Sequence, residues 1–153
     1  MLFRSLPQAV ITATDVSPEA LAVARDNAAR HGVADRIEFL ECDLLGHPQA
    51  AGPWDVIVSN PPYIRDDEFE GLPRDVRLHE PRSALVSGPT GVEVIERLAA
   101  AAAERLAPGG WLVCEIGPAE ASEAALASQA GLVSAPTLRD LAGLPRIVQA
   151  QKQ

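Results

Sequence analysis

One tetrapeptide of the sequence combines residue types that suit the binding of a planar amine or amide. Asn60 is followed by Pro61, Pro62 and Tyr63. The prolines fix two backbone φ angles and remove two N–H donors, which leaves carbonyl oxygens free to accept hydrogen bonds. The Asn60 carboxamide adds one acceptor and two donors, and Tyr63 adds a flat aromatic face. The segment favours a slot for a planar, NH2-bearing group, although a bare Pro-Pro pair can also simply end a strand.

The chemistry that such a slot favours is attack by the bound nitrogen on an electrophile. A planar NH2 group is a poor nucleophile because its lone pair is delocalised. Acceptors that hold its N–H hydrogens orient the nitrogen and aim the lone pair, which is a proximity effect. Neither a metal nor a nucleophilic side chain is required. We expect no metal, because His31, His47 and His79 lack metal-ligand spacing.

Two acids follow predicted strands and are candidates for binding a nucleoside. Asp15 ends the β-branched run at residues 9–15, and Asp43 follows the predicted strand at residues 36–41. An acid at a strand end can accept hydrogen bonds from the two hydroxyls of a ribose. Asp15 could equally begin a turn before Ser17, and Asp43 is common turn chemistry.

The elements that position these residues alternate between strand and helix along the chain. This alternation predicts a doubly wound α/β sheet with helices on both faces, in which ligands bind beyond the carboxyl ends of the strands. We expect residues 64–87 to form an irregular excursion with at most short turns. The predicted strands are residues 9–15, 36–41, 55–59 and 111–116, with an antiparallel pair at 132–138 and 146–150; the predicted helices follow the Ser17 cap to Gly32 and cover 91–106, closed by Pro108-Gly-Gly, and 119–130. The first of these helices should turn Leu21, Ala24, Ala28 and His31 inward.

Length and composition indicate one cytoplasmic domain over residues 1–153. The chain has 153 residues and a formal net charge of −8, which disfavours a phosphate-binding face and direct contact with nucleic acid. Its two cysteines cannot build a disulfide framework, and we expect Cys42 and Cys114 to fill core space. No apolar run approaches the roughly 20 residues of a membrane span. Residues 1–7 lack the order of a signal peptide.

Further motifs give the chain a family resemblance. Four segments resemble class I S-adenosylmethionine-dependent methyltransferases, and the Asn-Pro-Pro-Tyr form is that of the amino-methylating members. Four more narrow the resemblance to the release factor glutamine methyltransferases. The first four segments are Asp15–Leu21, Cys42–Leu44, Asn60–Ile64 and Leu106–Gly110; the others are His79–Arg82, Ala84–Gly88, Glu115–Gly117 and Arg139–Gly143 with Pro145-Arg146.

The resemblance implies a Rossmann-like methyltransferase sheet, mostly parallel, with a C-terminal antiparallel hairpin. It implies methyl transfer from S-adenosylmethionine to the side-chain amide nitrogen of the glutamine in the Gly-Gly-Gln motif of peptide-chain release factors. By the same resemblance, the ribose is held by Asp15, the adenine by Asp43 and Leu44, and the glutamine NH2 by Asn60, which also lies beside the cofactor, and by the Pro61 carbonyl, while Pro62 and Tyr63 line the slot.

Parts of the family pattern do not occur in this sequence. The family's first strand, its Gly-rich turn and its helical substrate-binding domain are lacking, and residues 1–7 resemble the tail of the helix after that turn. We therefore expect a truncated, partial domain with impaired activity alone. In the family the first strand lies between the strands corresponding to residues 9–15 and 55–59, so we also expect unpaired edges and self-association through them.

Other functions remain open at the level of sequence. A nucleic-acid amino-methyltransferase, acting on the exocyclic amine of adenine or guanine, would share Asn60–Tyr63 but should bring a basic track. A non-catalytic binding remnant would account for the missing glycine turn, and an oxidoreductase would need a phosphate-binding loop. Residues 65–87 are either a solvated loop or a flap over the substrate, which an ion pair between Glu80 and Arg82 could anchor.

Overall fold

The computed structural model of the chain describes residue 6, residues 8–117 and residues 119–153. The chain divides into two compact units, residues 1–52 and residues 53–153, and each is described by itself. A single domain over residues 1–153 stays a prediction. In residues 1–7, which resemble the tail of a helix by sequence, the structure describes Leu6 alone, so this prediction lies outside the described residues.

The first unit is a strand–helix–strand element, as the sequence predicts. β1 (Ile11–Asp15) and β2 (Ile37–Glu41) pair in parallel, from Ile11 opposite Ile37 to Asp15 opposite Glu41. The connecting helix α2 (Pro18–Arg30) packs against both strands. Two short 3₁₀ turns, η1 (Ala34–Arg36) and η2 (Pro48–Ala50), precede and follow β2.

Helix α2 begins where the sequence places its cap. The Ser17 hydroxyl accepts a hydrogen bond from the Ala20 amide at 3.1 Å, which satisfies one of the free N–H groups of the first turn. Leu21 and Ala28 are buried, as expected of the inner stripe. The expectation that His31 continues this stripe is wrong, because His31 is the cap residue beyond the last turn and is exposed.

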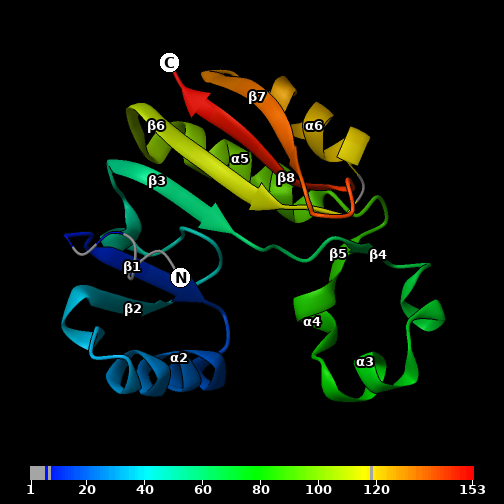
Figure 1. Cartoon of the computed structure of the whole chain (residues 1–153), viewed down its shortest axis with the longest axis horizontal. Coiled ribbons are helices and arrows are strands. Elements are labelled where there is room, and N and C mark those ends of the chain that lie inside the picture. The colour runs from blue at the N-terminus through cyan, green and yellow to red at the C-terminus, as the bar shows by residue number, and fades with distance from the viewer. Residues whose placement is uncertain (1–5, 7, 118) are drawn as a thin grey trace. The chain divides into compact units, whose positions relative to one another are not determined.

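The second unit is built on a four-stranded sheet (Figure 1). β3 (Trp54–Ser59) pairs in parallel with β6 (Leu106–Glu115), and β6 pairs in antiparallel with β8 (Pro145–Lys152). β7 (Leu132–Arg139) forms the outer strand and closes an antiparallel hairpin with β8. The order β3-β6-β8-β7 confirms the predicted C-terminal hairpin.

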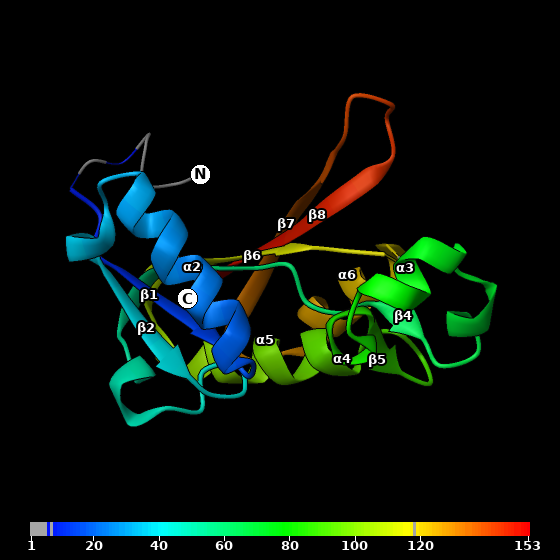
Figure 2. The ribbon, with the colours of Figure 1, turned by 90° about the horizontal axis from the view of Figure 1, so that it is seen from below.

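Two helices cover this sheet and form its core with it. α5 (Glu93–Arg105) and α6 (Ala119–Ser128) pack against each other, α5 against β6 and α6 against β7 and β8. Leu98 and Leu126 from the helices and Leu112 from the sheet are at most 2% exposed. The turn between β7 and β8 extends away from these helices (Figure 2).

The predicted end of helix α5 needs a correction. The sequence suggested that the helix reaches Leu106 and stops at Pro108-Gly-Gly, but α5 ends at Arg105 and Leu106 already belongs to β6. Trp54 pairs with Leu106 whereas Val56 pairs with Trp111, so the intervening residues form an irregularity in the strand. Pairing across the sheet therefore overrides the local helix preference.

The excursion at residues 64–87 has more regular structure than we expected. The prediction of an irregular segment with at most short turns is wrong, since the segment contains two short helices and a parallel pair of short strands. Its elements are β4 (Ile64–Arg65), η3 (Phe69–Gly71), α3 (Arg74–His79), α4 (Arg82–Leu85) and β5 (Val86–Gly88), with β4 paired to β5.

Contacts between residues far apart in the sequence hold the excursion together. Arg82 donates to the Asp66 carboxylate at 2.6 Å, and its guanidinium lies 4.8 Å from the centre of the Phe69 ring. Arg77 pairs with Glu70 at 2.9 Å. The hypothesis of an ion pair between Glu80 and Arg82 is replaced by the pair between Arg82 and Asp66.

Candidate functional site

Asp15 lies at the carboxyl end of β1 and is oriented by its own turn. Its Oδ1 accepts a hydrogen bond from the Ser17 amide at 2.9 Å, and the side chain is exposed. The Cys42 amide donates to the Asp15 carbonyl at 3.0 Å, which ties the ends of β1 and β2 together. Asp15 and the turn that begins at Asp43 therefore occupy the same edge of the two-stranded sheet.

The turn after β2 carries an unusual backbone conformation. Leu44 has φ of +49° and is the one non-glycine residue with positive φ among the described residues. A left-handed conformation costs a residue with a side chain about 1 kcal/mol or more, and such strain often marks ligand sites. The Gly46 amide donates to the Asp43 carbonyl at 2.9 Å, and the Cys42 thiol donates to the Leu44 carbonyl at 3.4 Å. The turn is thus fixed by its own hydrogen bonds.

The Asn60–Tyr63 segment begins directly where β3 ends. Ser59, the last residue of β3, pairs with Cys114 of β6, so the segment leaves the sheet at the carboxyl ends of this parallel pair. Asn60 is exposed, and Tyr63 is half-buried. Within the described part of the chain, no residue forms a hydrogen bond to the Asn60 carboxamide or to the Pro61 carbonyl. The exposed Asn60 carboxamide can therefore accept hydrogen bonds from a ligand, whereas Pro61 is buried.

The ring of Tyr63 lies against a glycine to which sequence reasoning assigned no role. A Cβ on Gly117 would come within 2.6 Å of Tyr63 Cδ2. The Glu115–Gly117 motif supports the family resemblance, but its contact with Tyr63 spans more than fifty residues of chain. Only the folded structure shows this contact.

The structure thus brings the candidate residues together in two groups. Asp15, Asp43 and Leu44 lie at one edge of the first unit, and Asn60–Tyr63 lie at the end of β3 in the second.

The Arg139–Arg146 motif has a structural explanation. Asp140 Oδ1 accepts hydrogen bonds from the Ala142 and Leu144 amides at 2.9 Å, and its Oδ2 accepts one from Arg146 Nε at 3.2 Å. The hydrogen bond from the Leu144 backbone, followed by that from Ala142 and the bond and charge of Arg146, lowers the pKa of Asp140. The motif therefore folds the turn between β7 and β8.

Cysteine and metal chemistry find little support in the described residues. Cys114 is fully buried, as expected, and burial raises the pKa of its thiol to about 12, so it is not ionised near neutral pH. Cys42 is half-buried and is also a free thiol. In the portion that the structure describes, no three His, Cys, Asp or Glu residues gather as metal ligands. The described helices all fall short of the length and apolarity that a membrane span needs.

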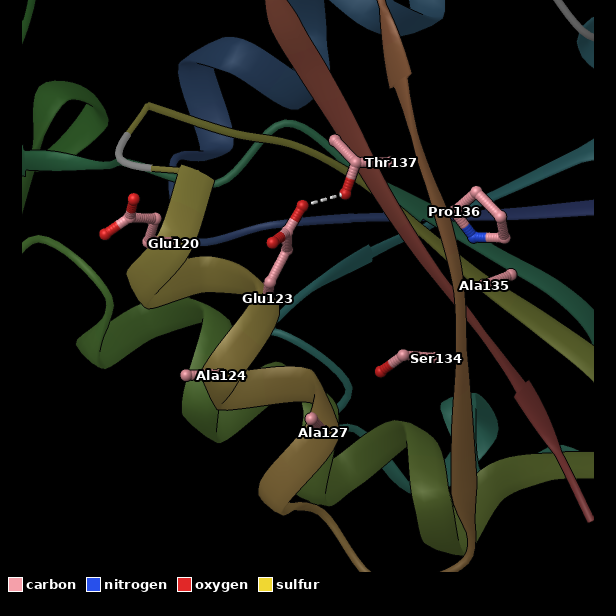
Figure 3. A pocket seen from close by; sticks show the side chains of 8 residues that line it. All are labelled: Glu120, Glu123, Ala124, Ala127, Ser134, Ala135, Pro136 and Thr137. Atoms are coloured by element: carbon pink, nitrogen blue, oxygen red, sulfur yellow. Dashed lines mark hydrogen bonds between the residues drawn. The ribbon is translucent and has the colours of Figure 1, made fainter.

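A groove of about 510 Å³ lies between α6 and β7, apart from these residues (Figure 3). Its rim carries two acids, Glu120 and Glu123, and the Glu123 carboxylate accepts a hydrogen bond from the Thr137 hydroxyl. The rest of the lining consists of short side chains: Ala124, Ala127, Ser134, Ala135 and Pro136. None of the sequence-predicted site residues lines it, and it is open to solvent, so we do not assign it as the site.

The sequence is similar to curated proteins of known name. The chain is 44% identical over 153 residues to the release factor glutamine methyltransferase of Bradyrhizobium diazoefficiens, covering 99% of this chain and 51% of that protein. It is 50% identical over 114 residues to the enzyme of the same name from Chlorobaculum tepidum, covering 72% and 38%. The chain spans about half the length of the curated relatives it matches.

Solved structures show the fold, and a family profile shows the family. The fold matches TrmN from Thermus thermophilus with a TM-score of 0.69 at 21% identity, over 99% of this chain and 39% of that one. At this identity the match shows a shared mixed α/β methyltransferase fold. The profile of a family described as "Methyltransferase domain" matches residues 1–78. The chain therefore belongs to the methyltransferase domain family.

Proposed function

We propose that the chain carries the methyl-transfer site of a release factor glutamine methyltransferase. In this proposal, a methyl group passes from S-adenosylmethionine to the side-chain amide nitrogen of the glutamine in the Gly-Gly-Gln motif of a peptide-chain release factor. The names of the relatives support this substrate. The observation that carries the proposal is the Asn60–Tyr63 segment, which presents the exposed Asn60 carboxamide at the carboxyl end of β3.

The residues of the first unit fit the nucleoside part of S-adenosylmethionine, which supplies a methyl group on a positively charged sulfur. Asp15 uses Oδ1 to accept from the Ser17 amide, so its Oδ2 is placed to accept from the ribose hydroxyls. In this proposal the neighbouring turn, with the exposed Asp43 and the half-buried Leu44, lies beside the adenine. A carboxylate acceptor and an apolar surface side by side are what a nucleoside requires.

Asn60 and Pro61 orient the substrate amide in this proposal. The Asn60 Oδ1 and the Pro61 carbonyl each accept one N–H of the glutamine carboxamide, while Pro62 and Tyr63 contact its two faces. The nitrogen then directs its lone pair at the methyl carbon. The new N–C bond forms as the C–S bond breaks, and the displaced N–H proton passes to solvent. No side chain of the enzyme forms a covalent bond in this step.

A cytoplasmic location belongs to the same proposal. Both cysteines are free thiols, which suits a reducing compartment. Release factors act on ribosomes, so the enzyme and its substrate would meet in the cytoplasm.

A methylation assay tests the proposal. The chain is incubated with methyl-labelled S-adenosylmethionine and either an intact release factor or a variant with alanine in place of the motif glutamine. We expect label on the intact factor alone, and none with Asn60→Ala, whose affinity for the cofactor should fall only moderately. Label on duplex DNA or ribosomal RNA, with release factor spared, would favour a nucleic-acid amino-methyltransferase instead. Binding of release factor without any transfer would favour a non-catalytic remnant.

A further inference from the structure

Two glycines from separate elements lie directly against Tyr63. A Cβ on Gly117, which follows β6, would come within 2.6 Å of Tyr63 Cδ2, 3.1 Å of Cγ and 3.3 Å of Cε2. A Cβ on Gly91, which precedes α5, would come within 2.8 Å of the Tyr63 carbonyl oxygen. Because real Cβ atoms do not approach other atoms this closely, both positions exclude a side chain as long as Tyr63 keeps its place.

Gly91 is itself held by a carboxylate. Glu93 Oε1 accepts hydrogen bonds from the Thr90 amide at 2.7 Å and the Thr90 hydroxyl at 2.8 Å, and Oε2 accepts one from the Gly91 amide at 3.0 Å. On the other side, Gly88 leaves room for this side chain, since a Cβ there would lie 2.7 Å from Glu93 Cδ. Glu93 therefore fixes the loop whose backbone supports the Tyr63 carbonyl.

We propose that Gly117, Gly91 and Glu93 are positioning residues that set the location of Tyr63 and, through it, the width of the substrate slot. The proposal rests on the function proposed above, in which Tyr63 forms one wall of that slot. Because Gly117 has no side chain, the Tyr63 ring can lie directly against the backbone that follows β6. Gly91, held by Glu93, places the main chain of Tyr63 at its carbonyl group. None of the three contacts the substrate.

This arrangement makes a quantitative expectation for Gly117→Ala. The added methyl group must displace the ring, because Gly117 is not among the residues with positive φ and the three atoms nearest to a Cβ there all belong to the Tyr63 ring. A displacement of about 1 Å in a substrate-positioning group lowers the rate about 100-fold. We expect kcat/KM for release factor to fall by about 10- to 100-fold, with cofactor affinity unchanged. Gly71→Ala is the matched control, since a Cβ at Gly71 meets nothing within 4 Å.

The position of Tyr63 can be measured without any assay of activity. The chain contains one tyrosine, so replacement by 3-fluorotyrosine gives a single ¹⁹F NMR signal that reports this ring. We expect Gly117→Ala to shift the signal and Gly71→Ala to leave it in place. Glu93→Gln should also shift it, because an amide cannot accept hydrogen bonds at both former oxygens. Glu96→Gln, an exposed change of equal charge on the same helix, should not.

Coupling between residues supplies the second part of the test. In a Tyr63→Ala background the ring is absent, so Gly117→Ala should cause no further loss of kcat/KM. Additive losses, or an unmoved fluorine signal in both Gly117→Ala and Glu93→Gln, would overturn the proposal. If Gly117→Ala does not fold, Glu93→Gln decides on the fluorine signal alone. Failure of the unaltered chain to methylate any release factor would refute the proposed function, while the fluorine measurement would still decide the position of Tyr63.

Discussion

Replacing Asp15 by asparagine separates ligand binding from local folding more cleanly than replacing it by alanine. Asparagine keeps one side-chain oxygen, which can still accept the hydrogen bond from the Ser17 amide that Asp15 Oδ1 accepts at 2.9 Å. The second oxygen becomes an NH2 group, which cannot accept from a ribose hydroxyl. Asp15→Asn therefore preserves the turn before α2 and removes the acceptor that we assign to the cofactor.

The size of the effect follows from the hydrogen bonds that are lost. A hydrogen bond to a charged acceptor contributes about 1.5–3 kcal/mol. Because each 1.4 kcal/mol changes a dissociation constant about tenfold, the Kd for S-adenosylmethionine should rise roughly 10- to 100-fold. The thermal unfolding midpoint without ligand should stay close to that of the unaltered chain.

Isothermal titration calorimetry measures this difference directly. Asp26→Asn serves as the control, because Asp26 is an exposed acid on α2 and its replacement changes the net charge by the same amount. Equal affinities for the unaltered chain, Asp15→Asn and Asp26→Asn would refute the role that we give to Asp15. A loss shared by both variants would show a general charge effect instead.

Three further predictions concern strain, pH and strand edges. Leu44→Val should lower the free energy of unfolding by about 1–3 kcal/mol, because a β-branched side chain tolerates positive φ poorly; urea denaturation checks this against Leu45→Val, and equal losses would contradict it. Although partial burial raises the pKa of Glu93, hydrogen bonds from the Thr90 amide, its own backbone, the Thr90 hydroxyl and the Gly91 amide lower it from 4.5 to about 2. The ionised form thus stabilises the fold above pH 4.5, and this contribution disappears as the pH falls toward 2, so melting curves of Glu93→Gln and the unaltered chain should converge there and differ at neutral pH; a constant difference would refute the assignment. Among the described strands, β3 has β6 as its one sheet neighbour, and Val58 of β3 is 52% exposed. Because an unpaired strand edge can pair with another chain, we expect the chain to self-associate in sedimentation velocity runs and Val58→Lys to shift it toward monomer. A monomeric unaltered chain would contradict this expectation.

Local signals in the sequence predicted most of the elements. Ser17 marked the start of α2 because a hydroxyl at that position satisfies a free amide, and the structure shows this bond. The prolines after Asn60 marked the end of β3 because proline cannot continue a strand ladder. Two short runs near the C-terminus, at residues 132–138 and 146–150, predicted the β7–β8 hairpin, which also forms.

Features that depend on distant partners could not be predicted in this way. Leu106 was expected to end a helix, but it pairs with Trp54 at the start of β3. The partner of Arg82 was sought two residues away and lies at Asp66, sixteen residues earlier. Sequence order carries little information about such contacts, because they arise only when separate elements pack.

The same distinction between local signals and distant contacts applies to the candidate site. The residue types at Asp15, Asp43 and Asn60–Tyr63 were informative because their chemistry can be inferred one residue at a time. The contact that supports Tyr63 could not be inferred from residue types, because Gly117 differs from other glycines only through the Tyr63 ring that lies against it. The left-handed conformation of Leu44 likewise has no signal in its residue type.

A crystal structure of the chain with S-adenosylhomocysteine and a peptide containing Gly-Gly-Gln would test the central claim most directly. We predict that the glutamine carboxamide lies beside Tyr63, with its NH2 group within about 3 Å of both Asn60 Oδ1 and the Pro61 carbonyl and its nitrogen facing the sulfur. A carboxamide bound elsewhere, or an Asn60–Tyr63 segment that contacts neither ligand, would contradict the claim.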